Sequence, residues 1–180
     1  HPTEGKIFLH GQEVRLTSPA SAVQRGIGMV HQHFMLVEAM TVFQNIILGL
    51  SQERSVLIHA GKLRAQIQAL SEKYGLEVSL DQKITELSVG AQQRVEILKA
   101  LWRGAEILIL DEPTAVLTDE ETEGLFAIIR RLQQEGKGIL FISHKLREVM
   151  AISDRILVLR RGEAVAEITD MTQANEQTLA

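Results

Sequence analysis

The sequence contains no cysteine, which excludes disulfide bonds and thiolate metal sites. It has no apolar run long enough to span a membrane, and its first residues show no signal-peptide pattern. We therefore expect a cytoplasmic protein. Acidic residues slightly outnumber basic ones, and the net charge of −4 gives no electrostatic reason to expect nucleic-acid binding.

The residues that are present are typical of a globular α/β domain. The 180 residues are 45% hydrophobic and 23% charged, which is enough for one domain with a sizeable core. Alternating strand-like and helix-like segments predict a mainly parallel sheet flanked by helices, with a small antiparallel portion. The expected strands are 6–9, 13–16, 27–31, 106–110, 138–142, 155–159 and 164–168, and the expected helices begin near Pro19, Thr41, Ala60, Ala91, Asp119 and Leu146. Residues 41–99 contain no convincing strand, so we expect a helical subdomain there, beside a sheet-containing core of residues 1–40 and 100–180.

The segment Ile107 to Leu110 organises the rest of the prediction. Four apolar residues in a row suit a strand that is buried on both faces, and Asp111, Glu112 and Pro113 follow where it ends. Two adjacent carboxylates are costly to bury unless a cation compensates them. At the carboxyl end of a parallel strand, the natural compensator is Mg²⁺ that carries a nucleotide phosphate. The alternative is a buried strand followed by an acidic helix start.

Polar residues follow two other predicted strands as well. Gln32 comes after residues 27–31, and His144 comes after residues 139–143. In open α/β sheets, ligands bind at the carboxyl ends of the strands. An amide, two carboxylates and an imidazole at that edge suit phosphoryl transfer, in which they hold Mg²⁺, polarise and orient water, and reach the terminal phosphate. Taken singly, a histidine at a strand end is more often structural and a glutamine is nearly uninformative, so the prediction depends on all three strand ends.

The segment Leu87 to Arg94 (LSVGAQQR) resembles the signature motif of ATP-binding-cassette (ABC) ATPases. Residues 111–114 (DEPT) resemble the Walker B segment of that family at the family spacing, and Gln32 and His144 then fall at its glutamine loop and switch histidine. The resemblance covers essentially the whole chain and implies a P-loop NTPase-like fold with ATP and Mg²⁺ as cofactors. It implies that Glu112 is the general base, that Asp111 and Gln32 contact Mg²⁺, and that His144 contacts the γ-phosphate.

Ser88, Gly90 and Gln92 are the signature residues that we expect to face a nucleotide. A helix that begins after Ser88 has free N–H groups and a positive dipole end, and both attract an anion. The resemblance implies that this helix start faces ATP held by a second ATPase half or subunit. The alternative is that Ser88 is only a helix cap.

Two further motifs resemble importers of nucleosides or simple sugars, namely residues 112–118 (EPTAVLT) and 141–146 (FISHKL). Val89, Ala91 and Thr118 depart from the usual ABC patterns, but these variants occur in that subgroup, and the chain resembles the first of two ATPase halves. The resemblance implies transmembrane permease subunits as partners, a solute-binding protein as an indirect partner, and a peripheral position on the inner face of the cell membrane. Residues 34–37 (FMLV) would form part of the permease-docking surface, or else simply pack in the core.

A P-loop, Gly-x-x-x-x-Gly-Lys-Ser/Thr, is missing from the sequence. Gly-Lys occurs at residues 5–6, 61–62 and 136–137, but neither Ser nor Thr follows it. We therefore expect that the first strand and the P-loop (Walker A) helix of an ABC ATPase are missing and that the chain belongs to a longer protein. Because the P-loop supplies most of the attraction for the β- and γ-phosphates, the chain alone should be inactive. The uncovered sheet should also favour self-association.

Two other functions stay open at this point. One is a soluble ABC-type ATPase that acts on ribosomes or DNA instead of in transport, although the mild acidity of the chain and the compact segment between Gln32 and Leu87 do not favour it. The other is a non-catalytic remnant that binds partners through its helical segment.

Overall fold

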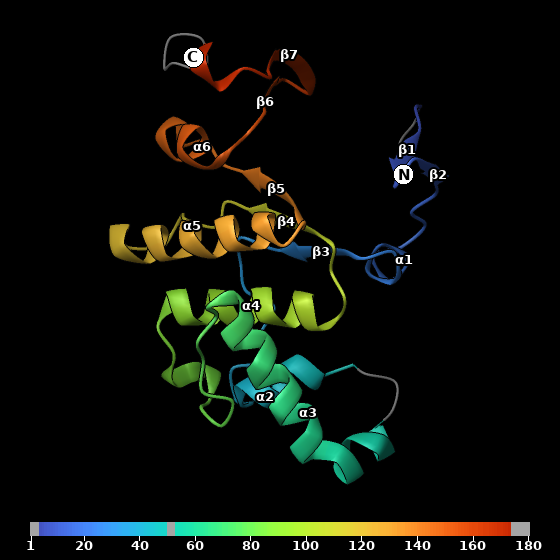
Figure 1. Cartoon of the computed structure of the whole chain (residues 1–180), viewed down its shortest axis with the longest axis vertical. Coiled ribbons are helices and arrows are strands. Elements are labelled where there is room, and N and C mark those ends of the chain that lie inside the picture. Colours follow the sequence, from blue (N-terminus) through green and yellow to red (C-terminus); the bar gives the residue numbers. More distant parts are fainter. Residues whose placement is uncertain (1–3, 50–52, 174–180) are drawn as a thin grey trace.

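A three-stranded parallel sheet lies at the centre of the molecule (Figure 1). The computed structural model describes residues 4–49 and 53–173. The sheet has the order β3-β4-β5, with strands β3 (Ile27–Val30), β4 (Ile107–Asp111) and β5 (Gly138–Ile142). Ile107 of β4 is in register with the first residue of each neighbouring strand, so the three carboxyl ends lie at one edge of the sheet. The predicted α/β fold is confirmed.

Helices and two small antiparallel hairpins complete the described fold. The helices are α1 (Pro19–Gln24), α2 (Val42–Ile47), α3 (Glu53–Tyr74), α4 (Val89–Trp102), α5 (Asp119–Gln134) and α6 (Leu146–Ile152), with short 3-10 turns at Ile84–Glu86 and Met171–Gln173. The hairpins pair β1 (Ile7–Leu9) with β2 (Gln12–Val14), and β6 (Ile156–Arg160) with β7 (Glu163–Ile168). In Figure 1 both hairpins lie away from the layer formed by α2, α3 and α4. None of the described helices combines the length and apolar character needed to cross a membrane.

Polar caps fix where most of the helices begin. Ser18, Thr41 and Ser88 cap α1, α2 and α4, as the sequence predicts. The predicted cap of α5, Asp119, is wrong. Thr118 is the cap, because its hydroxyl accepts the N–H of Glu121 while the Glu121 carboxylate accepts the N–H of Thr118, and Asp119 is the first helical residue.

One face of the sheet packs against α4 and α5. Leu108 and Leu110 of β4 are fully buried, and Val30 of β3 is in register with Leu110. They share one hydrophobic cluster with residues of α4 and α5, among them Ile97, Leu98, Leu101, Leu125 and Ile129. Each such side chain contributes about 1.5–3 kcal/mol when it is buried. This packing holds α4, the helix that carries the predicted signature at its start, against the strand that carries the acidic pair.

The opposite face of the sheet is less buried than the sequence predicts. Successive side chains of a strand point to opposite faces, and α4 and α5 cover only one of them. On the other face, Met29 is 40% exposed, Leu140 is 56% exposed and Ile142 is 44% exposed. The prediction that β4 and β5 are buried on both faces is therefore wrong for the described part of the chain.

Candidate functional site

Glu112 lies directly after β4 in an unusual backbone conformation. Its φ is +45°, in the left-handed region that residues other than glycine rarely adopt. Its N–H donates to the carbonyl oxygen of Ile142 at 2.9 Å, so the end of β5 holds the turn in place. Such conformations cost on the order of 1–3 kcal/mol and cluster at functional sites. The strain turns the Glu112 side chain towards the two neighbouring strand ends.

The glutamine, the glutamate and the histidine predicted at three strand ends meet at one point. Gln32 donates through Nε2 to Oε2 of Glu112 at 3.2 Å, and His144 Nδ1 lies 3.1 Å from Oε1 of the same carboxylate. The contact with His144 requires a hydrogen on Nδ1, because the carboxylate can only accept. Glu112 is 32% exposed and His144 is 71% exposed. The carboxylate is thus flanked on both oxygens and still open to solvent.

Asp111 and Gln32 form a donor set that fits a magnesium–nucleotide complex. Asp111 is the last residue of β4 and is half-buried beside Glu112. The Gln32 amide nitrogen faces Glu112, which leaves its carbonyl oxygen for a metal. Mg²⁺ in nucleotide sites takes one or two protein oxygens, and phosphate and water supply the rest. In agreement, the described residues contain no group of three or more His, Asp or Glu that could hold a metal by themselves.

A second carboxylate, Glu148 of α6, lies behind this site and was not predicted. Its Oε2 accepts from the Thr114 hydroxyl at 2.5 Å and from the Ser143 hydroxyl at 3.4 Å, and its Oε1 pairs with Lys145 Nζ at 3.0 Å. Glu148 therefore joins the turn after Glu112 to the loop that carries His144. Its place four residues after His144 carries no sequence signal for this contact, because the partner Thr114 is far away in the chain.

The start of α4 is occupied by a side chain from α5. Ser88 donates its hydroxyl to Oε1 of Glu121 at 3.3 Å, and Gly90 N–H donates to the same oxygen at 3.2 Å. Gln92, the third predicted signature residue, donates its amide back to the carbonyl of Leu87 at 3.2 Å. The sequence analysis missed Glu121, and the spacing Thr118-x-x-Glu121 of a capping box is the signal that could have found it.

The electrostatics of this helix start agree with an anion site. Hydrogen bonds hold the pKa of Glu121 below its usual value, with the largest contribution from the Thr118 backbone N–H and further ones from Gly90 and Ser88, against an opposing effect of desolvation. An ionised carboxylate is favoured where free N–H groups and the helix dipole converge. Ser88 is a cap, as the alternative reading requires, and at the same time it presents its hydroxyl to an anion.

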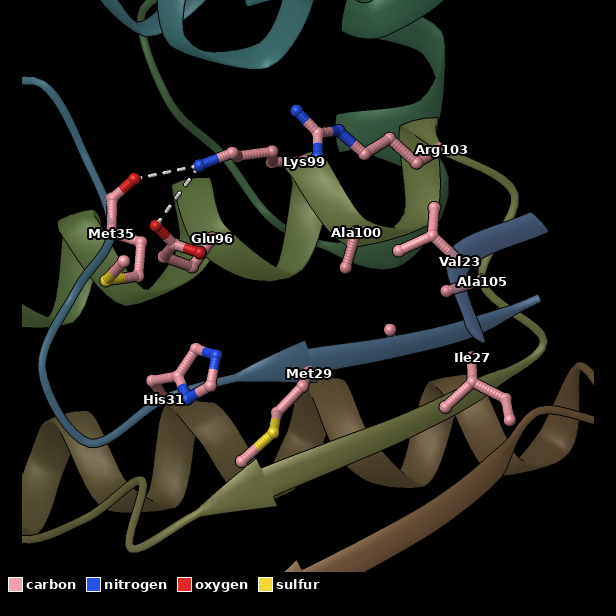
Figure 2. Close-up of a pocket in the computed structure, with 11 residues that line it drawn as sticks. Val23, Ile27, Met29, His31, Met35, Glu96, Lys99, Ala100, Arg103 and Ala105 are labelled. Carbon is pink, nitrogen blue, oxygen red and sulfur yellow. Dashed lines mark hydrogen bonds and ion pairs between the residues drawn. The ribbon is translucent and has the colours of Figure 1, made fainter. Parts of the chain in front are cut away.

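A cavity of about 160 Å³ lies between α4 and β3 (Figure 2). Glu96 and Lys99 of α4 lie on its upper side, and Lys99 Nζ donates to the Met35 carbonyl at 2.9 Å. Val23 and Ile27 contribute apolar side chains further along. Of the four residues 34–37, Leu36 packs against the core, whereas Met35 and Val37 are exposed. Core packing therefore explains only part of that segment.

A family model described as ABC transporter matches residues 1–115. The chain belongs to the ABC transporter family. It is 50% identical over 173 residues to the nucleoside import ATP-binding protein NupA of Lactococcus lactis, covering 95% of this chain and 34% of NupA. It is 43% identical over 202 residues to the glucose import ATP-binding protein TsgD13 of Haloferax volcanii, covering 96% of this chain and 37% of TsgD13.

A solved structure agrees with this placement in the ABC transporter family. The dimeric structure of the ATP-binding cassette MJ0796 bound to ADP and Pi is similar with a TM-score of 0.74 and 26% identity, over 93% of this chain and 74% of that one. The present chain spans about a third of the length of the curated relatives that it matches. The predicted ABC fold and family are thus confirmed, whereas the roles of individual site residues stay predictions.

Proposed function

We propose that this chain is part of an ATPase that powers the import of a nucleoside or a simple sugar through a membrane permease. The observation that carries the proposal is the contact of Gln32 and His144 with the two oxygens of Glu112. The relatives, which are named as nucleoside and glucose import proteins, support the choice of transport over a soluble role.

In this proposal each residue at the strand ends has one task. Glu112 accepts a proton from the attacking water, and a carboxylate within hydrogen-bond reach of that water is suited to it. Asp111 and Gln32 hold Mg²⁺, which neutralises charge on the phosphates when it is bound. His144 donates a hydrogen bond towards the terminal phosphate. Ser88, Gly90 and Gln92 face the ATP held by a second ATPase half or subunit.

The proposal also requires a P-loop, which none of the 180 residues supplies. We therefore call the intact ATPase this chain joined to a P-loop segment. It would act at the inner face of the cell membrane, with a solute-binding protein as an indirect partner and without nucleic acid.

Glu112→Gln in the intact ATPase tests the proposed reaction. The amide keeps the shape of the side chain but cannot take a proton, so Mg-dependent phosphate release should fall about 100-fold or more while ATP still binds in calorimetry. The matched control is Glu123→Gln, the same change at an exposed position of α5. The 180-residue chain without a P-loop is a second arm and should show no useful turnover. Equal turnover of Glu112→Gln and the control would reject the assignment of the base.

We propose that the permease docks at the cavity between α4 and β3 and at the exposed side chains of Met35 and Val37. Glu96 is only 5% exposed, and its Oε1 has no hydrogen-bond partner in the described part of the chain, so a donor on the permease would satisfy it. Met35→Glu should reduce co-purification of the permease, because it places a charge in an apolar contact. Phe8→Glu, at a comparably exposed residue of the first hairpin, is the control. Unchanged co-purification of Met35→Glu would exclude this surface.

A further inference from the structure

Glu148 makes more contacts with other elements than its place in the first turn of α6 requires. An acidic residue there is favoured by the helix dipole alone, and that effect needs no partner. Glu148 nevertheless accepts from the Thr114 hydroxyl at 2.5 Å and from the Ser143 hydroxyl at 3.4 Å, and it pairs with Lys145 at 3.0 Å. Its side chain is only 14% exposed. A half-buried carboxylate with three charged or hydroxyl donors is a strong local tie.

The partners of Glu148 belong to the two loops that carry the reacting groups. Thr114 is buried and lies two residues after Glu112. Ser143 and Lys145 are the two neighbours of His144 in the chain. Lys145 adds a second tie, because its Nζ donates to the Thr114 carbonyl at 3.0 Å. Both polar groups of Thr114 are thus bound by residues at or next to the start of α6.

His144 itself has little else to hold it in place. Its side chain is 71% exposed, so packing does not fix the imidazole, and its contact with Glu112 at 3.1 Å is a single hydrogen bond. A single exposed hydrogen bond contributes only about 0.5–1.5 kcal/mol. The position of the ring is therefore set mainly by the backbone of residues 143–145, and that backbone is tied to Thr114 through Glu148.

We propose that Glu148 is a positioning residue that keeps His144 in register with Glu112 during ATP hydrolysis. This inference rests on the proposed function. Catalytic groups must be held within about 0.5 Å of their productive geometry, and a displacement of about 1 Å can cost about 100-fold in rate. Glu148 touches no reacting atom and acts only through the loop of His144. Its loss should lower kcat and leave KM for ATP nearly unchanged, because the phosphate cradle lies elsewhere.

The test is a double-mutant cycle in the intact ATPase with Glu148→Gln, His144→Ala and the pair. The amide keeps the size of the side chain but loses the ion pair and one strong acceptor. Glu148→Gln should reduce kcat about 10- to 100-fold with KM within about twofold. In the His144→Ala background it should cause no further loss, whereas a general weakening of the fold would lower both backgrounds equally. Glu163→Gln, on exposed β7, is the control.

A second variant guards against misfolding of Glu148→Gln. Ser143→Ala removes one donor to Glu148 without burying a new polar group, and it should give a smaller kcat loss that also disappears in the His144→Ala background. The proposal is wrong if Glu148→Gln turns over at the wild-type rate, or if its effect is the same with and without His144. Failure of the proposed function would look different, because Glu112→Gln would then retain full activity.

Discussion

Gly90 has no room for a side chain, because the carboxylate of Glu121 lies against its Cα. A Cβ at Gly90 would lie 2.6 Å from Oε1 and 2.9 Å from Cδ of Glu121. The close approach lets the Gly90 N–H and the Ser88 hydroxyl reach the same carboxylate oxygen. Gly90 is therefore required by geometry for an anion to approach the start of α4.

Gly90→Ala should destabilise the chain and disable the signature. The methyl group must push Glu121 away, which breaks the hydrogen bonds that Gly90 and Ser88 donate to it, so we expect a loss of about 1–3 kcal/mol in unfolding free energy. Gly124→Ala is the matched control, because a Cβ there meets nothing within 4 Å. Alanine is the better helix former, so this control should gain about 0.5–1 kcal/mol. Urea unfolding of both variants measures the contrast, and equal stabilities would contradict it.

At the scale of the elements, the ends of α4 and α5 are joined by the same carboxylate. Glu121 forms the capping box of α5 with Thr118 and also binds the first turn of α4. Buried Gln93 of α4 adds a second link, because it donates to the carbonyl of Pro113 at 2.7 Å. The helix that begins with the signature is thus tied to the segment that follows the acidic pair.

Replacing Glu121 should change how stability depends on pH. The pKa of Glu121 is lowered in the fold, chiefly by the Thr118 backbone N–H. A lowered folded pKa gives stability that is present above the unfolded value, about 4.3 for Glu, and that is lost as the pH falls through the folded pKa. Wild type should therefore be more stable than Glu121→Gln at neutral pH, and the difference should shrink under acid. Thermal melts of both proteins from pH 7 to pH 3 measure it, and a constant difference would contradict the ionised contact.

The sequence predicted the elements better than it predicted their surroundings. Strand β4, its acidic end and the signature helix could be read from local patterns of apolar residues, caps and motif spacing. The contacts of Glu121 and Glu148 could not, because each joins residues more than thirty positions apart. The exposure of Leu140 was missed for a related reason. An apolar run indicates that a strand can be buried on both faces, but it does not say which helices cover it.

On the scale of the whole molecule, β5 is the element with the most unsatisfied surface. Among the described residues it pairs only with β4, so its other edge presents free backbone groups. Leu140 and Ile142 are exposed on the face that α4 and α5 leave open. Unpaired strand edges combined with exposed apolar side chains are typical sites of association.

We therefore expect the purified 180-residue chain to self-associate through β5. Light scattering should show an average mass that rises with protein concentration, because each copy can cover the apolar face and the free edge of another. Replacing Leu140 by Glu and Ile142 by Lys should shift the mass towards the monomer, since a charge is costly to bury in such a contact. Val165→Lys is the control, because Val165 is 54% exposed but lies in the separate hairpin of β6 and β7. A constant monomer mass for the wild-type chain would show that its own residues protect β5, and an equal response of the control would move the contact away from the sheet.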